Sequence, residues 1–478
     1  MIKKLLVSSI LFSVITIPLP SISQAGVFDD FSGDTIDGNK WKNQELVREV
    51  KSGKLVTGIR INTDQTGGYG NRTQFQNPNT IYKMQASVKI DSYNFDTSIT
   101  DSDHQDIGAE LQGNFYRDAS GDVLAGIALI DFTGPDGLQA GCHVESEGGS
   151  EAAQMFTMAV SAGTSYSLSI GYNETSGEFI CRIENESTTA SEEITLARPT
   201  DDLGDPANGY KALTTFYSIH DEPNGAFEVD AAIFASYDNV EVNDGPYDDF
   251  NTAPIDINNW SSREIVRKVN SGRLQLTQQN VGMSRETNRM RTADSVQGGD
   301  FFQVDITMDG NSQISGSTAT FGQAIAGGFF YNDTHDGSYN GREGDNYARI
   351  HLQLNSLGTL VANARIWRCD NVACSSDSGV WSQDFTTAPA EDVPQTVSIE
   401  RVGSVLKFKM NDEVIEYTVI GNIFNPSHAQ RRLTTRVNST DGEQGHVTAY
   451  FDNVYLQKPN SFAWNLFLPA IVSKQQAD

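Results

Sequence analysis

The chain has 478 residues, with 34 basic and 62 acidic side chains, a formal charge of −28 and 38% hydrophobic residues. This hydrophobic content is enough for ordinary cores and argues against a disordered chain. A strong negative charge repels phosphate backbones and anionic membrane surfaces, so nucleic acid is not expected as a partner.

Residues 1–25 have the pattern of a secretory signal peptide. Lys3 and Lys4 precede an apolar run, and small residues at Ser23 and Ala25 predict cleavage after Ala25. The apolar run is shorter than the roughly 20 residues of a membrane span, so no stable membrane span is expected. We therefore expect an exported protein, which is extracellular, on the cell surface or periplasmic.

The rest of the chain contains an internal repeat. Residues 29–55 align without gaps to residues 248–274, with 14 identities in 27 positions. This indicates a tandem duplication of units of roughly 215 residues. The turn residues Asn243 to Pro246 mark the boundary. We predict one domain over residues 26–243, a second over residues 246–458, and a tail over residues 459–478.

Short alternating segments dominate each unit. The stretches "YKMQASVKID" from Tyr82, "YSLSIGY" from Tyr166 and "VLKFKM" from Val405 place an apolar residue at every second position. This period is typical of half-buried strands, and no long segment has the period of a helix. The sequence therefore predicts an all-β fold in which each unit forms a sandwich or barrel.

The opening "DDF…W…V…SGkL" frame, a middle "G..fY.D", the late "VSIERVGSVLKFKMND" hairpin and the final "FDNVYL" resemble the concanavalin A-like lectin/glucanase superfamily, with laminin-G-type jelly rolls. The resemblance implies two tandem jelly-roll β-sandwiches. It also implies that the first and last strands of each unit are neighbours, which would place Phe31, Val240, Phe250 and Val454 in the cores. Trp41 and Trp260 are expected to be core residues, with a sugar-stacking platform as the alternative.

The retaining glucanases of this superfamily carry Glu-x-Asp-x-Glu on one strand, with the outer carboxylates as nucleophile and acid. In "FEVDAAIF", Glu228 and Asp230 alternate correctly, but Ala232 replaces the third carboxylate. The pattern is therefore broken, and we expect a polar strand face rather than a glucanase site.

The lyases of the superfamily use an arginine, a Gln-His pair and a tyrosine on the concave sheet. The segment "ARIHLQL" places Arg349, His351 and Gln353 on one strand face, without a Gln-x-His order. A half-exposed structural histidine is the alternative to a catalytic one. No motif predicts an organic cofactor or a transition-metal site.

Four cysteines in an exported chain predict two local disulfides, Cys142–Cys181 and Cys369–Cys374. Near the second pair, an aromatic pair with polar neighbours is what the face of a sugar requires. The alternative is that one or both tryptophans are buried. The predicted ligand-binding residues are Trp367, Trp381, Arg365 and Tyr331.

Aspartates gather in the repeated opening and closing segments, and Ca²⁺ prefers carboxylate and carbonyl oxygens. The sequence therefore predicts a structural calcium ion at each seam, with hydrogen bonds to turn amides as the alternative. The predicted ligands are Asp30 and Asp238 in the first unit, and Asp249 and Asp452 in the second.

The sequence favours a non-catalytic exported protein that binds a glycan or another extracellular polymer. One alternative is a polysaccharide hydrolase or lyase with an unrecognised site. Another is a structural component of a surface layer or filament, because fold alone does not decide function.

Overall fold

The computed structural model describes residues 26–63, 66–95, 105–132, 137–147, 151–219, 229–282, 284–296, 298–335, 341–440 and 442–457. The predicted signal peptide and the predicted tail lie outside the described residues. Strands make up nearly all the regular structure of these ranges, with one short 3-10 helix, η1 (Pro78–Thr80). None of the helical structure in these ranges is long and apolar enough to cross a membrane.

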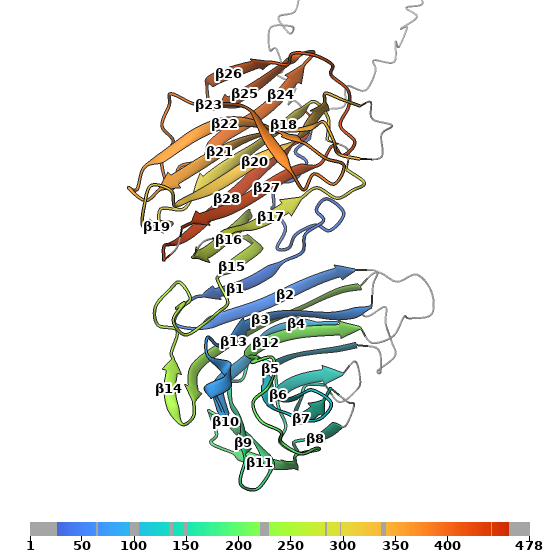
Figure 1. Ribbon diagram of the computed structural model, residues 1–478, viewed down its shortest axis with the longest axis vertical. Helices are drawn as coiled ribbons and strands as arrows, with labels where there is room; N and C mark the ends of the chain where they lie inside the picture. The colour runs from blue at the N-terminus through green and yellow to red at the C-terminus, as the bar shows by residue number, and fades with distance from the viewer. Residues whose placement is uncertain are drawn as a thin grey trace, which may run out of the picture.

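Two β-sandwiches share one long sheet, as Figure 1 shows. Each sandwich also has a six-stranded antiparallel sheet of its own. In domain 1 the order is β3 (Gly67–Gln74), β12 (Lys211–Ile219), β5 (Gln105–Arg117), β6 (Asp122–Phe132), β7 (Gln139–Ser146) and β8 (Glu151–Met155). In domain 2 it is β17 (Ser284–Arg291), β27 (Arg431–Ser439), β20 (Phe321–Asn332), β21 (Asp345–Asn355), β22 (Leu360–Cys369) and β23 (Asp377–Asp384).

The shared sheet has 16 strands. Domain 1 contributes β11 (Ser191–Ala197), β10 (Glu178–Asn185), β9 (Tyr166–Asn173), β4 (Lys83–Asn94), β13 (Val229–Val242), β2 (Leu55–Thr63) and β1 (Leu46–Val50), with β14 (Gly245–Asp248) beside β13. Domain 2 continues with β15 (Ile265–Asn270), β16 (Arg273–Val281), β28 (Gln444–Tyr455), β18 (Phe301–Met308), β24 (Gln395–Val402), β25 (Val405–Met410) and β26 (Glu413–Thr418), with β19 (Gln313–Ser315) beside β28. This architecture confirms the predicted all-β jelly-roll sandwiches.

The alternating pattern of the sequence explains the layers, because alternate side chains of a strand point to opposite faces. The strand β4 alternates half-buried and buried residues over its first eight positions. The buried residues of each domain form a separate apolar core between its two sheets. In domain 1 the predicted disulfide is confirmed, and Cys142 on β7 is joined to Cys181 on β10, which ties the two sheets together.

The two domains meet through the antiparallel pair β1 and β15. Val47 lies opposite Val266, which is the same position of the repeat. The hydrogen bonds around this pair are reciprocal as well: Arg48 Nε donates to the carbonyl of Arg263, and Arg267 Nε donates to that of Gln44. The junction is therefore approximately two-fold symmetric, like an isologous dimer interface within one chain.

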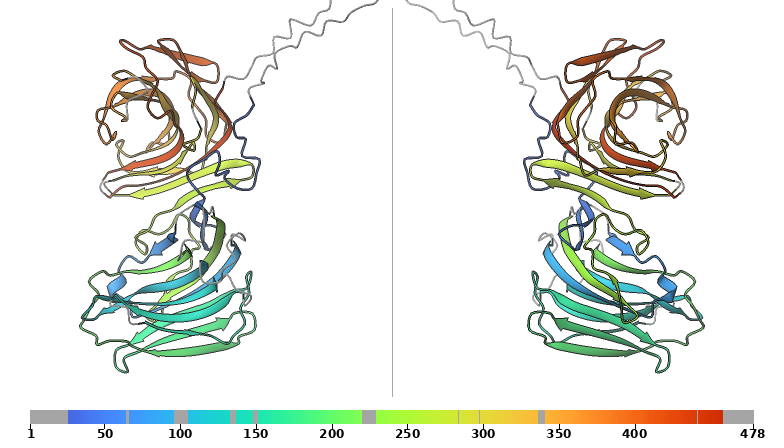
Figure 2. Two further views of the ribbon diagram at one scale, coloured as in Figure 1. Left: turned by 90° about the vertical axis from the view of Figure 1, so that its right-hand side faces the viewer. Right: turned by 90° about the vertical axis from the view of Figure 1, so that its left-hand side faces the viewer.

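The opening segments of the two units are exchanged between the domains. Residues 28–41, the first exchanged segment, bond to β28: Phe28 N donates to Val454 O at 2.7 Å, and Val454 N donates to Asp29 O at 2.7 Å. Figure 2 shows this blue segment running along the domain that contains the red strands. Residues 247–260, the second exchanged segment, follow the short pairing of β14 with β13 in domain 1.

The packing corrects the predicted arrangement within each unit. Phe31, Ile36 and Trp41 belong to the core of domain 2, whereas Phe250, Ile255 and Trp260 belong to the core of domain 1. The sequence boundary at Asn243 to Pro246 assigned these segments the other way round. Both segments carry Phe, Ile and Trp at the same spacing, so each fits either core. Trp41 and Trp260 are 1% and 0% exposed, which confirms that they are core residues and excludes a sugar platform.

Candidate functional site

Seven arginines project from the outer face of the six-stranded sheet of domain 2, which we call the arginine face. They stand at alternate positions of four strands, so they share the side opposite the apolar core. The arginine face consists of Arg285, Arg289 and Arg291 on β17, Arg432 and Arg436 on β27, Arg349 on β21, and Arg365 on β22.

Four of these arginines form one row across the strands. Arg291 pairs with Arg432, which pairs with Gly327, and Gly327 pairs with Arg349, which pairs with Arg365. Neighbouring strands are about 4.8 Å apart, so the row spans roughly 19 Å. Gly327 is the one position of the row without a side chain, and a Cβ there would clash with the side chain of Arg349.

A groove of about 490 Å³ lies over the arginine face. Trp367 lines it beside the row, and the guanidinium of Arg349 lies 5.4 Å from the centre of its ring. Arg432 lies over Phe329 and Tyr347 at 4.9 and 5.3 Å. Stacking on rings holds these guanidinium planes in place while leaving their N–H groups free to donate.

Many polar atoms of this groove are buried without a hydrogen-bond partner. They are Nε of Arg291, Arg349, Arg432 and Arg436, Oε1 of Gln323, Nδ1 of His351 and Nε1 of Trp367. Buried polar groups are nearly always paired in folded proteins, and an unpaired one costs roughly 1 to 3 kcal/mol. Five of these atoms, the four arginine Nε atoms and Trp367 Nε1, are donors, and a cluster of unpaired donors at one place is typical of a site that a ligand completes.

Acids balance only a small part of the charge of the arginine face: Asp377 lines the groove and acts on Arg349, and Asp294 acts on Arg291. Arg368, at the rim, pairs with Asp333 and Asp370, but among the described residues no carboxylate lies within ion-pair distance of the seven arginines. Burial, with the charges of neighbouring arginines and against the effect of Tyr347, lowers the pKa of Arg349, Arg432 and Arg436 to about 10. All three still carry their charge at neutral pH, so they repel one another and favour an anion.

His351 lies on the floor of this face and is 1% exposed. Burial holds its pKa well below the ordinary value, and the charges of Arg349, Arg365 and Arg436 act in the same direction. The imidazole is therefore neutral at physiological pH. Gln353, two positions along β21, accepts a hydrogen bond from Gln323 at 2.7 Å.

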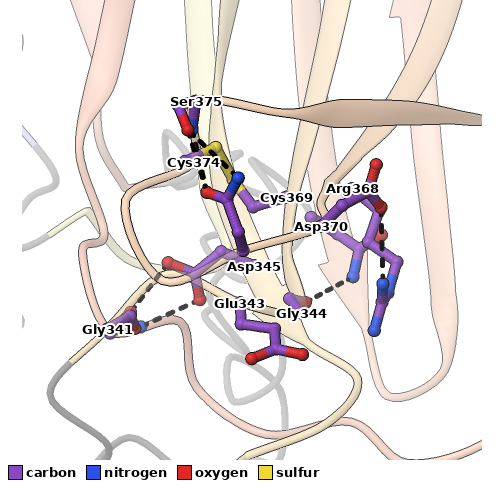
Figure 3. The surroundings of a disulfide bond; sticks show 12 residues. Gly341, Glu343, Gly344, Asp345, Arg368, Cys369, Asp370, Cys374 and Ser375 are labelled. Carbon is purple, nitrogen blue, oxygen red and sulfur yellow. Dashed lines mark hydrogen bonds and ion pairs between the residues drawn. A yellow bond between two sulfur atoms is a disulfide. The ribbon is translucent and has the colours of Figure 1, made fainter.

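The second predicted disulfide, Cys369–Cys374, is also confirmed, and it closes a loop at the rim of the groove. Figure 3 shows this loop packed against the segment from Glu343 to Asp345, where Gly344 N donates to Cys369 O at 2.9 Å. Within the loop, Ser375 N donates to the side chain of Asn371 at 3.0 Å.

The predicted ligand-binding residues separate into two groups. Trp367 and Arg365 line the groove. Trp381 packs against the core of domain 2, stacked on Phe408 at 5.3 Å. Tyr331 is 1% exposed within the same core. The structure therefore does not bring Trp381 and Tyr331 to the groove, because their positions on their strands point to the opposite face.

The segment exchange separates the calcium ligands that were predicted for one unit. Asp30 lies near Asp452 of domain 2, whereas Asp249 follows β14, which pairs with β13 of domain 1. The charges of Asp305 and Asp30 act on Asp452, and with its burial they raise its pKa. Asp30 and Asp249 accept hydrogen bonds from the amides of Ser32 and Asn251. Among the residues that the structure describes, no three His, Cys, Asp or Glu side chains are grouped to hold a metal ion.

The bonds to turn amides match the alternative interpretation of these aspartates. Asp238 likewise accepts a hydrogen bond from the amide of Asn239. Calcium at Asp30, Asp238, Asp249 and Asp452 stays a prediction. Melting with and without EDTA tests it, because a ligand that binds only the folded state raises its stability.

Of the two acids in the broken glucanase pattern, only Asp230 lies among the described residues, near the start of β13. Asp230 forms an ion pair with Arg60 at 2.8 Å, and Glu228 lies outside the described residues. Five of the seven arginines of the face were not predicted from the sequence. The signal was present in "RETNRMR", where Arg285, Arg289 and Arg291 occupy positions of one parity in a chain that is otherwise acidic.

No family model and no curated protein matches the chain. Among solved structures, a winged bean acidic lectin matches 41% of this chain and 90% of its own, with 12% identity and a TM-score of 0.22. An alginate lyase matches 40% and 83%, with 14% identity and a TM-score of 0.21. Domains LG4-5 of the mouse laminin alpha1 chain match 90% and 92%, with 9% identity and a TM-score of 0.21. These are similarities to concanavalin A-like jelly rolls, and at such TM-scores they carry no argument about activity.

Proposed function

We propose that the chain is an exported protein that binds an acidic polysaccharide on the arginine face of domain 2 without cutting it. The observation that carries the proposal is the set of seven arginines, none of which has an ion-pair partner among the described residues and four of which have a buried Nε without an acceptor. Carboxylate and sulfate groups are acceptors that match the planar guanidinium. A glycan that carries such groups would complete the hydrogen bonds of the groove.

The other domain supports a functional role for these arginines. The motif Leu-Thr-Thr at Leu213 and at Leu433 aligns β12 with β27, and the strand pairings then align the rest of the two sheets. The same sheet forms in domain 1 without most of the arginines, so folding does not require them. The corresponding residues are Gly68, Arg72 and Gln74 on β3, Ala212 and Phe216 on β12, Gly126 on β6, and His143 on β7.

The row from Arg291 to Arg365 supports a linear ligand. It crosses five strands in one line, and its ends lie roughly 19 Å apart. A stretched polymer with a regularly repeated negative group can contact several of these arginines at once. The formal charge of −28 makes most of the molecule repulsive to such a polymer, which favours binding at this face.

Binding without cleavage is the simpler function for this groove, and one observation favours a second candidate. His351 is neutral and its Nδ1 has no partner, as a base that removes a proton next to a carboxylate would require. Arg349 could neutralise that carboxylate, and the bond to the leaving sugar oxygen would then break by elimination. The 1% exposure of His351 opposes this candidate, because a base must reach the proton that it takes.

The test measures binding and cleavage on the same samples. We expect isothermal titration to detect uronate or sulfated polysaccharides, with an affinity that falls as salt rises. We expect no reducing ends and no unsaturated products. Unsaturated products that vanish in His351→Ala would establish the lyase instead. Binding of neutral polymers alone would contradict the proposed function.

A further inference from the structure

Domain 1 carries a buried acid on the face that corresponds to the arginine face. Glu110 on β5 pairs with Thr214 on β12, and in domain 2 the pairing of Ile325 with Thr434 occupies the same place. Glu110 is 5% exposed, and its Oε1 has no hydrogen-bond partner. Since an isoleucine fits at this position of the other sheet, the fold does not require the carboxyl. A buried polar group without a partner lowers stability, so its presence needs a reason.

Other polar groups surround this carboxyl, and together we call them the Glu110 cluster. His143 Nε2 lies 3.5 Å from Glu110 Oε1. The guanidinium of Arg72 lies 5.5 Å from the centre of the Tyr210 ring, and the buried hydroxyl of Tyr210 also lacks a partner. A carboxyl and a hydroxyl from different segments therefore lie close enough to interact, and neither Glu110 Oε1 nor the Tyr210 hydroxyl has a hydrogen-bond partner.

The backbone beneath the cluster is adapted to its side chains. A Cβ at Gly126 would clash with Glu110 Oε1 and with the ring of His143. Gly126 occupies the position of Arg349, and His143 that of Arg365. On the same sheet, Phe132 and Met155 are 42% and 37% exposed. Phe132 stands four positions along β6 from the partner of Glu110, and Met155 stands three strands away from Glu110.

The cluster has little net charge at neutral pH. Burial raises the pKa of Glu110 to about 8; the charge of Asp106 also raises it, and the charge of Arg72 lowers it. Burial lowers the pKa of His143. Burial and the charge of Glu110 raise the pKa of two neighbouring groups, Tyr210 and, on the core side, Tyr237. Below pH 8 the carboxyl is protonated and can donate a hydrogen bond as well as accept one.

We infer that the Glu110 cluster is a second ligand site, which takes an uncharged saccharide through hydrogen bonds to Glu110 and Tyr210 and apolar contact beside them. The hydroxyl groups of a sugar donate and accept hydrogen bonds, so they match a protonated carboxyl and a phenol. A polyanion would have one exposed arginine, Arg72, to bind here. The two domains would thus bind chemically different glycans. This site does not depend on the arginine face.

The test titrates the full chain with unsubstituted gluco-, galacto-, manno- and xylo-oligosaccharides below and above pH 8. We expect binding that weakens above pH 8, when Glu110 ionises. Glu110→Gln, which stays neutral, should bind at both pH values. Glu110→Ile should lose affinity by about tenfold or more while raising the melting temperature of domain 1. Glu193→Gln, which changes an exposed acid on β11 in the other sheet of domain 1, is the control and should not change this binding.

Three results would overturn the inference. The first is that none of these oligosaccharides binds the native chain. The second is that Glu110→Ile binds as well as the native chain does. The third is that Glu110→Ile melts lower, because the carboxyl would then stabilise the fold rather than serve a ligand.

Discussion

The exchange of segments predicts that a mutation in one repeat unit destabilises the domain formed by the other. Trp41 is 1% exposed, its ring stacks on Phe31 at 5.7 Å, and its Nε1 donates to Asp29 at 2.6 Å. Replacing a buried tryptophan by alanine costs about 3 to 5 kcal/mol. A loss of about 4 kcal/mol raises the population of the unfolded domain roughly a thousandfold.

Hydrogen exchange of the full chain, read by mass spectrometry, locates this effect. Trp41→Ala should speed exchange in β20 and β28 of domain 2 and leave β5 and β13 of domain 1 protected. Trp260→Ala is the matched variant, because its Nε1 donates to Asp248 at 2.6 Å in the same geometry, and it should do the reverse. Faster exchange of domain 1 in Trp41→Ala would refute the exchanged packing.

Two further predictions concern the disulfides and pH. Removing Cys369–Cys374 by a double serine substitution should weaken binding of acidic polysaccharide a few-fold, because its loop lines the groove; an unchanged affinity would contradict this. The matched removal of Cys142–Cys181, which are 39 residues apart, should cost domain 1 about 4 kcal/mol by the chain-entropy model and leave that affinity unchanged. Glu110→Gln should stabilise domain 1 in melts as pH rises. The pKa of Glu110 is about 8 in the folded chain and 4.5 in the unfolded chain, so the native chain loses stability as pH rises between these two values. A stability difference between Glu110→Gln and the native chain that does not change with pH would contradict the prediction.

The sequence predicted the strands of the fold, but it did not predict that the opening segments of the two units are exchanged between the domains. The alternation of apolar and polar residues identifies a strand because it depends only on residues that are close in the sequence. The two disulfides could be predicted because each unit contains one pair of cysteines. The core that Phe31 enters could not be predicted, because Phe250 also follows an Asp-Asp pair and precedes an Ile and a Trp at the same spacing. Register decides whether Trp381 faces the core or the groove, and the shift between Ile366 and Trp367 where β22 pairs β23 is not visible in the sequence.

The arginine face was hidden for a related reason. Its members come from four strands that are distant in sequence, and only the sheet brings Arg291 beside Arg432 and Arg349 beside Arg365. The lack of ion-pair partners among the described residues, which makes the set unusual, is a property of the folded chain. The comparison with the equivalent sheet of domain 1 also requires the strand pairing.

The measurement that tests the central claim most directly is titration of one acidic polysaccharide into three forms of the full chain. Arg289 and Arg72 hold the same position in the two sheets, which makes them a matched pair. The native chain and Arg72→Gln should bind alike, whereas Arg289→Gln combined with Arg349→Gln should lose about 3 kcal/mol or more, which is over a hundredfold in affinity. Equal binding by all three forms would contradict the arginine face as the binding site.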